Sequence, residues 1–384
     1  MADDRVYCTM VPFELKALTR MFFGTGAVER VGRLARELGG HRVLLVSDPG
    51  VVRTGHTDSV RTRLIDAGLE VFAFDGFGAS PDSDDAERGR GFAAPLAIDL
   101  IVAVGGGSSL DCAKAINFLL TNGGAMADYR GYGKITTRLL PMIGVPTTAG
   151  TGSEAQSYAV IADAATKMKM ACGDPSAAFT VALLDPALTM SAPRGVTATA
   201  GYDAIAHAVE TTVTTRRTPL SDAYSLQAWR LLSGAYERAL TQPSDFEARS
   251  AMQVGAFLAG LAIEHSMLGA AHACANPLTA RYDLTHGAAL AILLPHVVRW
   301  NADIATERYA LLVPTAASAP AEALATQLEH FAAVGGLATT LSAAGVEPGA
   351  LTALAAQAAQ QWTGGFNPRS FDAEGALEIY QAAL

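Results

Sequence analysis

Short apolar runs alternate with stretches of helical spacing along the first half of the chain. Five runs have the length and the aliphatic content of buried strands, at residues 43–46, 71–74, 100–104, 142–145 and 181–184. Strands that alternate with helices in this way form parallel sheets, because each helix carries the chain back to the same edge. The pattern therefore predicts an α/β fold with a parallel sheet over this half.

The pattern changes after Asp185 and Pro186. Long Ala- and Leu-rich stretches with helical periodicity follow, and no convincing β-branched run occurs before the end of the chain. Pro186 and Pro193 mark the break, and 384 residues are more than one ordinary core needs. We expect an α/β domain over residues 1–189 and an all-α domain over residues 190–384.

Composition narrows the class of protein. Half of the residues are hydrophobic and 17% are charged, as in a compact globular enzyme. The formal charge of −9 and the absence of any Lys/Arg block argue against nucleic-acid binding. No apolar run approaches the ~18 residues of a membrane span, and no signal peptide is recognisable. We expect a cytoplasmic protein with no membrane partner; its cysteines, which form no C-x-x-C pair, are Cys8, Cys112, Cys172 and Cys274.

A glycine loop follows the apolar run 100–104. Gly105, Gly106 and Gly107 lead through Ser108 into a helical pattern that contains Asp111. Without Cβ atoms such a loop brings backbone N–H groups close to a pyrophosphate, and the helix N-terminus adds partial positive charge. A tight strand-to-helix turn without a ligand explains a lone glycine cluster as well.

A second loop at residues 146–154 follows another expected strand. It combines glycines with the hydroxyls of Thr147, Thr148 and Thr151. Hydroxyl donors and bare backbone suit phosphate and ribose oxygens, and two such loops at strand ends form a nucleotide site. Together the loops predict a Rossmann-like nucleotide-binding domain.

Asp48 ends the first clear apolar run. A carboxylate there can accept hydrogen bonds from the ribose hydroxyls of NAD(H) and repel the 2′-phosphate of NADP(H). The equally simple alternative is that Asp48 caps the helix that follows.

A group of polar residues stands out in the Ala-rich second half. Asp203 and His207 are spaced i, i+4, which puts both on one face of a helix. His272 and His286 lie 14 residues apart and flank an expected turn at residues 282–285. An isolated histidine in an apolar helix is usually a hydrogen-bonded core residue, but one carboxylate with three imidazoles suits a divalent metal, Fe²⁺ or Zn²⁺ among others.

The glycine loops and the residues around Asp203 and His286 resemble those of the iron-containing, group III alcohol dehydrogenase family, and the resemblance extends over nearly the whole chain. The resemblance implies a dehydroquinate-synthase-like fold, with the nicotinamide meeting the metal between the two domains. It also implies that Asp203, His207, His272 and His286 bind the metal and that Lys169 lies near the cofactor. The segments that carry it are residues 23–26, residues 105–108 with Asp111 and Lys114, and residues 146–154, 201–210 and 286–296.

Two departures from the family pattern concern the proton and the substrate. Asn276 stands where the family has a histidine four residues after the third ligand, and Asn cannot titrate in its place. His265 either supplies the missing base or is a helix-end histidine without that duty. Tyr158 and Trp362 are expected to line the substrate pocket, although either can simply pack the domain interface.

The expected enzyme is a metal-dependent NAD(H) alcohol dehydrogenase or aldehyde reductase. Hydride passes between the nicotinamide and a primary alcohol or aldehyde whose oxygen the metal polarises. A phosphonoaldehyde or hydroxyacid dehydrogenase of the same family is the alternative, and a dehydroquinate-synthase-like lyase or a non-catalytic scaffold fits less well. The resemblance also implies a homodimer.

Overall fold

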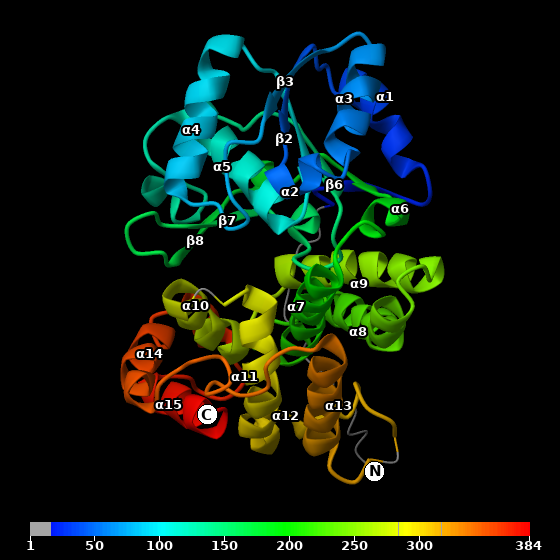
Figure 1. Ribbon diagram of the computed structural model, residues 1–384. Helices are drawn as coiled ribbons and strands as arrows, with labels where there is room; N and C mark the ends of the chain where they lie inside the picture. Colours follow the sequence, from blue (N-terminus) through cyan, green and yellow to red (C-terminus); the bar gives the residue numbers. More distant parts are fainter. Residues whose placement is uncertain (1–16, 283, 316) are drawn as a thin grey trace, which may run out of the picture.

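The computed structural model describes residues 17–282, 284–315 and 317–384. A six-stranded sheet forms the first half and a group of helices the second (Figure 1). The strand order is β1-β9-β6-β4-β2-β3, and every neighbouring pair is parallel. The strands are β1 (Arg20–Phe23), β2 (Arg42–Val46), β3 (Glu70–Phe74), β4 (Leu100–Gly105), β6 (Met142–Pro146) and β9 (Val181–Leu184).

The five strands expected from the apolar runs are all present, and the predicted fold class is confirmed. β1 was missed because its four residues begin with Arg20 and leave Phe23 45% exposed, so no buried run marks it. It lies at the edge of the sheet and pairs only with β9.

Helices cover both faces of this sheet. Alternate residues of β2 enter different cores: Val43 and Leu45 pack with one cluster, Leu44 and Val46 with another. Such two-sided burial is why the strands read as continuous apolar runs. Figure 1 shows one pair of helices on each side of the strands. The pairs are α1 (Val31–Glu37) with α3 (His56–Asp66), and α4 (Ser83–Ala93) with α5 (Gly107–Asn122); α2 (Pro49–Val52) and α6 (Pro186–Thr189) are short.

A second, three-stranded sheet lies beside α5. Its strands are β5 (Gly131–Tyr132), β7 (Tyr158–Ala162) and β8 (Lys169–Gly173), in the order β5-β8-β7. β5 runs parallel to β8, and β7 antiparallel to it. The sequence analysis did not predict these strands. β5 has only two residues, β8 begins with Lys169, and burial in β7 and β8 alternates although their residues do not alternate between apolar and polar.

The second half is helical, as predicted. None of the described helices is long and apolar enough to cross a membrane. α7 lies at its centre and contacts α8, α9 and α11. The helices are α7 (Arg194–Val213), α8 (Pro219–Thr241), α9 (Phe246–Glu264), α10 (Ala270–Tyr282), α11 (His286–Trp300), α12 (Ala302–Tyr309), α13 (Pro320–Gly335), α14 (Leu351–Ala358) and α15 (Ala373–Ala382).

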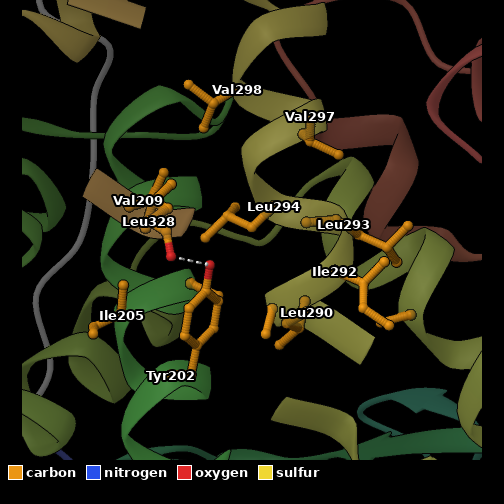
Figure 2. Packing of buried hydrophobic residues seen from close by; sticks show 14 of the residues in the cluster. Tyr202, Ile205, Val209, Leu290, Ile292, Leu293, Leu294, Val297, Val298 and Leu328 are labelled. Carbon is orange, nitrogen blue, oxygen red and sulfur yellow. Dashed lines mark hydrogen bonds between the residues drawn. The ribbon is translucent and has the colours of Figure 1, made fainter. Parts of the chain in front are cut away.

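One face of α7 is part of the helical core (Figure 2). Tyr202, Ile205 and Val209 follow the i, i+3, i+7 spacing of a single helix stripe and pack with Leu294 of α11. The Tyr202 hydroxyl donates a hydrogen bond to the Leu328 carbonyl of α13, at 3.2 Å. This core holds α7 firmly and leaves its adjacent stripe for polar side chains.

Candidate metal centre and cofactor loops

The polar stripe of α7 carries the first two predicted metal ligands. Asp203 and His207 lie one turn apart, and His207 Nε2 is 3.2 Å from Asp203 Oδ1. Both side chains are buried. The i, i+4 spacing predicted this arrangement from the sequence.

His272 and His286 reach the same carboxylate from two other helices. His272 Nε2, from α10, lies 3.6 Å from Asp203 Oδ1, and His286 Nε2, from the first residue of α11, lies 3.9 Å from it. The rings of His207 and His272 stack with centroids 4.9 Å apart. The structure thus brings the four predicted ligands together, with the three imidazoles arranged around Oδ1 of Asp203.

These side chains fit a metal ion. Ligand atoms of Asp203, His207 and His272 all lie within 4.8 Å of one another. Asp203 Oδ1 and His272 Nε2 are buried and have no hydrogen-bond partner within the part of the chain that the structure describes. Buried polar atoms are nearly always paired, so unpaired atoms that face a common point indicate a missing ligand. Three imidazoles and one carboxylate suit Fe²⁺ or Zn²⁺.

The electrostatics keep most of these groups ready to bind a cation. Burial lowers the pKa of His207 to about 4 and that of His286 to about 3, so both imidazoles are neutral. Burial alone raises the pKa of Asp203, but the neighbouring imidazoles of His207, His272 and His286 outweigh it and hold the pKa below its usual value. A neutral imidazole and an ionised carboxylate are the metal-binding forms.

Glu210 is a residue of this centre that the sequence analysis did not single out as functional. It lies on the same stripe of α7, three residues after His207, and is buried. One oxygen of its carboxylate accepts the Ala271 backbone N–H at 2.7 Å, and the other bonds His272 Nδ1. Burial lowers the pKa of His272, but the Glu210 carboxylate outweighs it and raises the pKa to about 9. The carboxylate fixes the ring so that Nε2 faces Asp203.

Replacing Glu210 by Gln is expected to weaken metal binding about 10- to 100-fold, because the amide keeps the shape but loses the charge that orients and polarises His272. Competition with a chromophoric chelator measures the affinity. Glu237→Gln is the matched control, because Glu237 also pairs with a histidine, His330 Nε2 at 3.2 Å, on the surface. Equal affinities of Glu210→Gln and the control would contradict this role for Glu210.

The two glycine loops lie against each other. A Cβ on Gly106 would lie 3.1 Å from Thr148 Oγ1, and one on Gly107 would lie 2.8 Å from Thr151 Oγ1. The Thr147 N–H donates to the Gly105 carbonyl at 3.0 Å, and Gly105 has a φ of +147°. Glycine is therefore required for this turn and for the close approach of the second loop. Gly106 precedes the first residue of α5, so the loops meet at a helix N-terminus.

Asp48 and Ser108 make definite contacts beside these loops. Asp48 caps α2, with Oδ1 accepting the Gly50 N–H at 2.8 Å, and its Oδ2 accepts the Ser109 hydroxyl at 2.9 Å. The capping role considered from the sequence is thus observed, and the ribose role stays a prediction. The Ser108 hydroxyl donates to the Ala79 carbonyl.

Buried charged side chains contact the second loop, residues 146–154, and the segment that follows it. Lys114 is fully buried and donates to three carbonyls, those of Ser153, Gln156 and Tyr158, at 2.7–2.8 Å. Burial raises the pKa of Asp111 to about 6, and Lys114 offsets part of that effect. Lys169 on β8 is close enough to act electrostatically on both Asp111 and His286. Lys169 is therefore close to both Asp111 of α5 and His286 of the candidate metal centre.

Glu154→Gln is expected to change the pH dependence of stability. Burial raises the pKa of Glu154 from 4.5 to about 7. A raised acid pKa contributes stability below pH 4.5 that is lost as pH rises through 7, and the loss amounts to about 3 kcal/mol. Wild type should lose this stability between pH 4.5 and pH 8, and Glu154→Gln should not. The unfolding free energy of the variant minus that of wild type should therefore increase by about 3 kcal/mol over this range. Urea titrations at both pH values measure it, and a difference that does not vary with pH would refute it.

The other predicted residues lie on segments around the centre. Asn276 Nδ2 donates to Gln361 Oε1 at 3.1 Å, and His265 caps the C-terminus of α9, its ring 6.0 Å from that of Tyr224. No hydrogen bond or ring contact of the described residues joins His265 to the four ligands. Tyr158 and Trp362 contact each other, with ring centroids 5.8 Å apart.

Comparison with known proteins identifies the family. The profile described as "Iron-containing alcohol dehydrogenase" matches residues 19–186, and "Fe-containing alcohol dehydrogenase family, C-terminal" matches residues 197–384. The NAD-dependent methanol dehydrogenase of Bacillus methanolicus is 33% identical over 369 residues, 94% of this chain and 97% of its own. The 1,3-propanediol dehydrogenase of Citrobacter freundii is 37% identical over 291 residues, 75% of each chain.

Solved structures of related proteins support the same family assignment. A crystal structure of 1,3-propanediol oxidoreductase has a TM-score of 0.91 at 33% identity and covers 95% of this chain and 97% of its own. The chain belongs to the iron-containing alcohol dehydrogenase family, an oxidoreductase family that acts on CH–OH groups. The resemblance found in the sequence is confirmed, and the lyase and scaffold alternatives gain no support.

Proposed function

We propose that this chain is an NAD(H)-dependent alcohol dehydrogenase with one divalent metal, Fe²⁺ or Zn²⁺, held by Asp203, His207, His272 and His286. The observation that carries the proposal is the convergence of the imidazoles of His207, His272 and His286 on the Asp203 carboxylate, where the buried Asp203 Oδ1 and His272 Nε2 have no hydrogen-bond partner among the described residues. When bound, the metal supplies Lewis-acid polarisation of the alcohol or aldehyde oxygen. The protein supplies two neutral imidazoles, a carboxylate and the Glu210 anchor of His272.

The cofactor is proposed to lie across the two glycine loops. The α5 N-terminus and the bare backbone of Gly105, Gly106 and Gly107 suit its pyrophosphate. The hydroxyls and charges nearby suit its ribose and nicotinamide ends; the residues assigned to it are Asp48, Ser108, Asp111, Thr147, Thr148, Thr151 and Lys169. The contact between the loops supports a single site.

Asp48→Ser is expected to relax the preference for NADH. Serine keeps the helix cap that Asp48 provides, so stability should change little, while the charge that repels a 2′-phosphate is removed. The ratio of kcat/KM with NADPH to that with NADH should rise about tenfold or more, which corresponds to about 1.4 kcal/mol. Steady-state kinetics with both cofactors measure it. Wild-type enzyme that prefers NADPH would overturn the role given to Asp48.

The proton route rests on the residues near Asn276. Asn276 cannot titrate, so we assign it a role in orienting the substrate and not in proton transfer. The hydrogen bond from its side-chain amide to Gln361 fits that role. His265 stays a prediction as the base; burial lowers its pKa, which favours the neutral ring, the form that can accept a proton. The expected organisation is two domains, 1–189 and 190–384, in a cytoplasmic homodimer.

One panel tests the proposal. Alcohols and aldehydes that span a primary alcohol series, a hydroxyacid and a phosphonoaldehyde are assayed with NAD⁺ or NADH on Fe²⁺- and Zn²⁺-loaded protein. The proposal expects stoichiometric NADH formation from primary alcohols, lost on chelation and restored by metal. Turnover confined to the hydroxyacid or the phosphonoaldehyde would favour the alternative. Absence of turnover with every compound would reject the proposal.

A further inference from the structure

The three-stranded sheet has one face that is only partly buried, which we call the open face: Tyr158, Val160, Lys169 and Ala171 are half-buried on it, and Ala162 and Gly173 are buried. Its register pairs Tyr158 with Gly173, Val160 with Ala171, and Ala162 with Lys169. Paired residues project from the same face of a sheet, so these six share one face. The residues between them project to the other face and are buried against α5: Ala159, Ile161, Met170 and Cys172.

The end of this open face at Gly173 carries two aromatic rings. Gly173 also pairs with Tyr132 of β5, on the other side of β8. The rings of Tyr132 and Tyr158 meet across it, with centroids 5.5 Å apart. A Cβ on Gly173 would lie 2.6 Å from Tyr132 Cδ2 and 2.7 Å from Tyr158 Cδ1. Glycine therefore leaves the space that both rings occupy.

Trp362 of the helical region completes the group. Its ring centroid is 5.8 Å from that of Tyr158, and the ring of Phe366 meets it edge-on at 6.2 Å. Trp362 is 45% exposed and Tyr132 is 51% exposed. We call Tyr132, Tyr158 and Trp362 the aromatic group. Large apolar rings that gather from two regions of the chain and stay in contact with water mark a binding surface.

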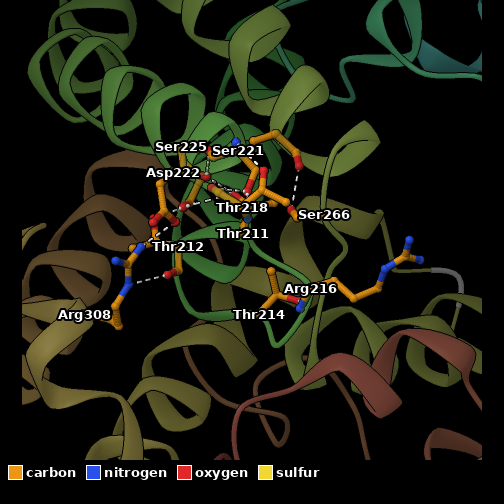
Figure 3. Close-up of polar contacts among 12 residues, drawn as sticks. Thr211, Thr212, Thr214, Arg216, Thr218, Ser221, Asp222, Ser225, Ser266 and Arg308 are labelled. Atoms are coloured by element: carbon orange, nitrogen blue, oxygen red, sulfur yellow. Dashed lines mark hydrogen bonds and ion pairs between the residues drawn. The ribbon is translucent and has the colours of Figure 1, made fainter. Parts of the chain in front are cut away.

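The segment that carries Trp362 is firmly anchored. The Phe366 carbonyl accepts the Thr215 N–H at 2.9 Å and the hydroxyls of Thr214 and Thr215 at 3.2 Å. Figure 3 shows Thr214 and Arg216 in this connection between α7 and α8. The Arg216 guanidinium lies 5.5 Å from the centre of the Phe366 ring. The aromatic group is thus held in place rather than loosely exposed.

Two connections link the aromatic group to the metal centre. Asn276 lies one turn after His272 on α10 and donates to Gln361, the residue before Trp362. On the sheet, Lys169 pairs with Ala162, which follows Tyr158 by four residues on β7. Lys169 is therefore at the other end of the open face, roughly 13 Å along the strand from Tyr158. Between them the face carries the side chains of Val160 and Ala171, and Ala162 lies opposite Lys169. An apolar strip of small side chains therefore runs from Lys169, which acts electrostatically on His286, to the aromatic group.

We propose that the strip and the aromatic group bind the substituent of the substrate, so that the enzyme selects primary alcohols and aldehydes with a bulky apolar substituent, an aryl ring or a long alkyl chain. This inference rests on the proposed alcohol dehydrogenase function. Continuity with the metal-ligand helix through Asn276 and Gln361 favours a substrate over a second copy of the chain as the occupant. Burial of apolar substrate surface supplies the preference.

Kinetics over an alcohol series test the inference on the metal-loaded enzyme with NAD⁺. From ethanol through butanol and hexanol, kcat/KM should rise about fourfold per buried methylene, and benzyl alcohol should exceed ethanol. Tyr158→Ala and Trp362→Ala should lose about tenfold or more with hexanol and benzyl alcohol but less than about threefold with ethanol. Gly173→Ala, which displaces the rings without removing either, should also flatten the series. Phe92→Ala, an exposed aromatic of α4, should keep the wild-type series.

A binding readout separates this inference from the proposed function. Addition of 1-octanol to the protein should shift the emission of Trp362 to shorter wavelength as its ring leaves water, and Trp362→Phe should lack the shift. A protein that turns over no alcohol yet shows the shift would reject the proposed function and keep the aromatic site. Turnover with a flat series, or without the shift, would overturn the aromatic site and keep the proposed function, and would leave a second copy as the occupant.

Discussion

Asp203→Ala and His272→Ala are expected to fold normally, bind no metal and lose turnover. Within residues 17–282, 284–315 and 317–384, Asp203 provides the only carboxylate that all three imidazoles approach, and the Glu210 carboxylate orients His272 toward it. Polarisation of the substrate oxygen by a metal contributes several kcal/mol to the transition state. A loss of about 4 kcal/mol lowers kcat about a thousandfold.

Metal content by mass spectrometry and NADH formation measure both effects on the same samples. His330→Ala is the matched control, because His330 is an exposed histidine that also pairs with a carboxylate, Glu237. The control should keep one metal per chain and full turnover. Wild-type metal content in either ligand variant would remove that residue from the centre.

Gly287→Ala is expected to damage both stability and metal binding. Gly287 follows the proposed ligand His286 in the first turn of α11, and a Cβ there would overlap the Thr199 carbonyl of α7, lying 2.6 Å from its carbon atom. Backbone atoms cannot rotate away, so α11 must move from α7. Overpacking with a backbone shift costs about 3 kcal/mol, and His286 would move away from Asp203.

Denaturant unfolding of the metal-free proteins measures the first effect, and metal titration the second. Gly234→Ala is the control: Gly234 lies inside α8, and a Cβ there meets nothing within 4 Å in the described structure. That change should stabilise the protein by about 1 kcal/mol through helix propensity. If Gly287→Ala matched Gly234→Ala in both measurements, close contact between α7 and α11 would not be what positions His286.

Most of the fold could be predicted because its strands are buried on both faces. Residues 43–46 and 100–104 are continuous apolar runs for that reason. β1, β7 and β8 were missed because their less buried positions carry mostly apolar or small residues, so no alternation of apolar and polar residues marks them. Pairing among β5, β7 and β8 depends on contacts distant in sequence.

The candidate metal centre and its surroundings also contain features that the sequence predicts and features that depend on the tertiary structure. Asp203 and His207 share a helix, so their i, i+4 spacing predicted their contact. His272 and His286 were grouped with them by residue type and the expected turn between them, and the family resemblance gave the same four residues. The role of Glu210 was open to prediction, because an acid three residues after His207 in an apolar helix lies on the same stripe. The contact of Tyr132 with Tyr158 was not, because it depends on sheet register and on the space over Gly173.

Anomalous diffraction from crystals of the Fe²⁺- or Zn²⁺-loaded enzyme tests the central claim most directly. Data collected on either side of the metal absorption edge locate the ion without reference to activity. We predict one peak per chain, bounded by Asp203, His207, His272 and His286. A peak elsewhere, or fully active crystals with no peak among these four side chains, would contradict the account.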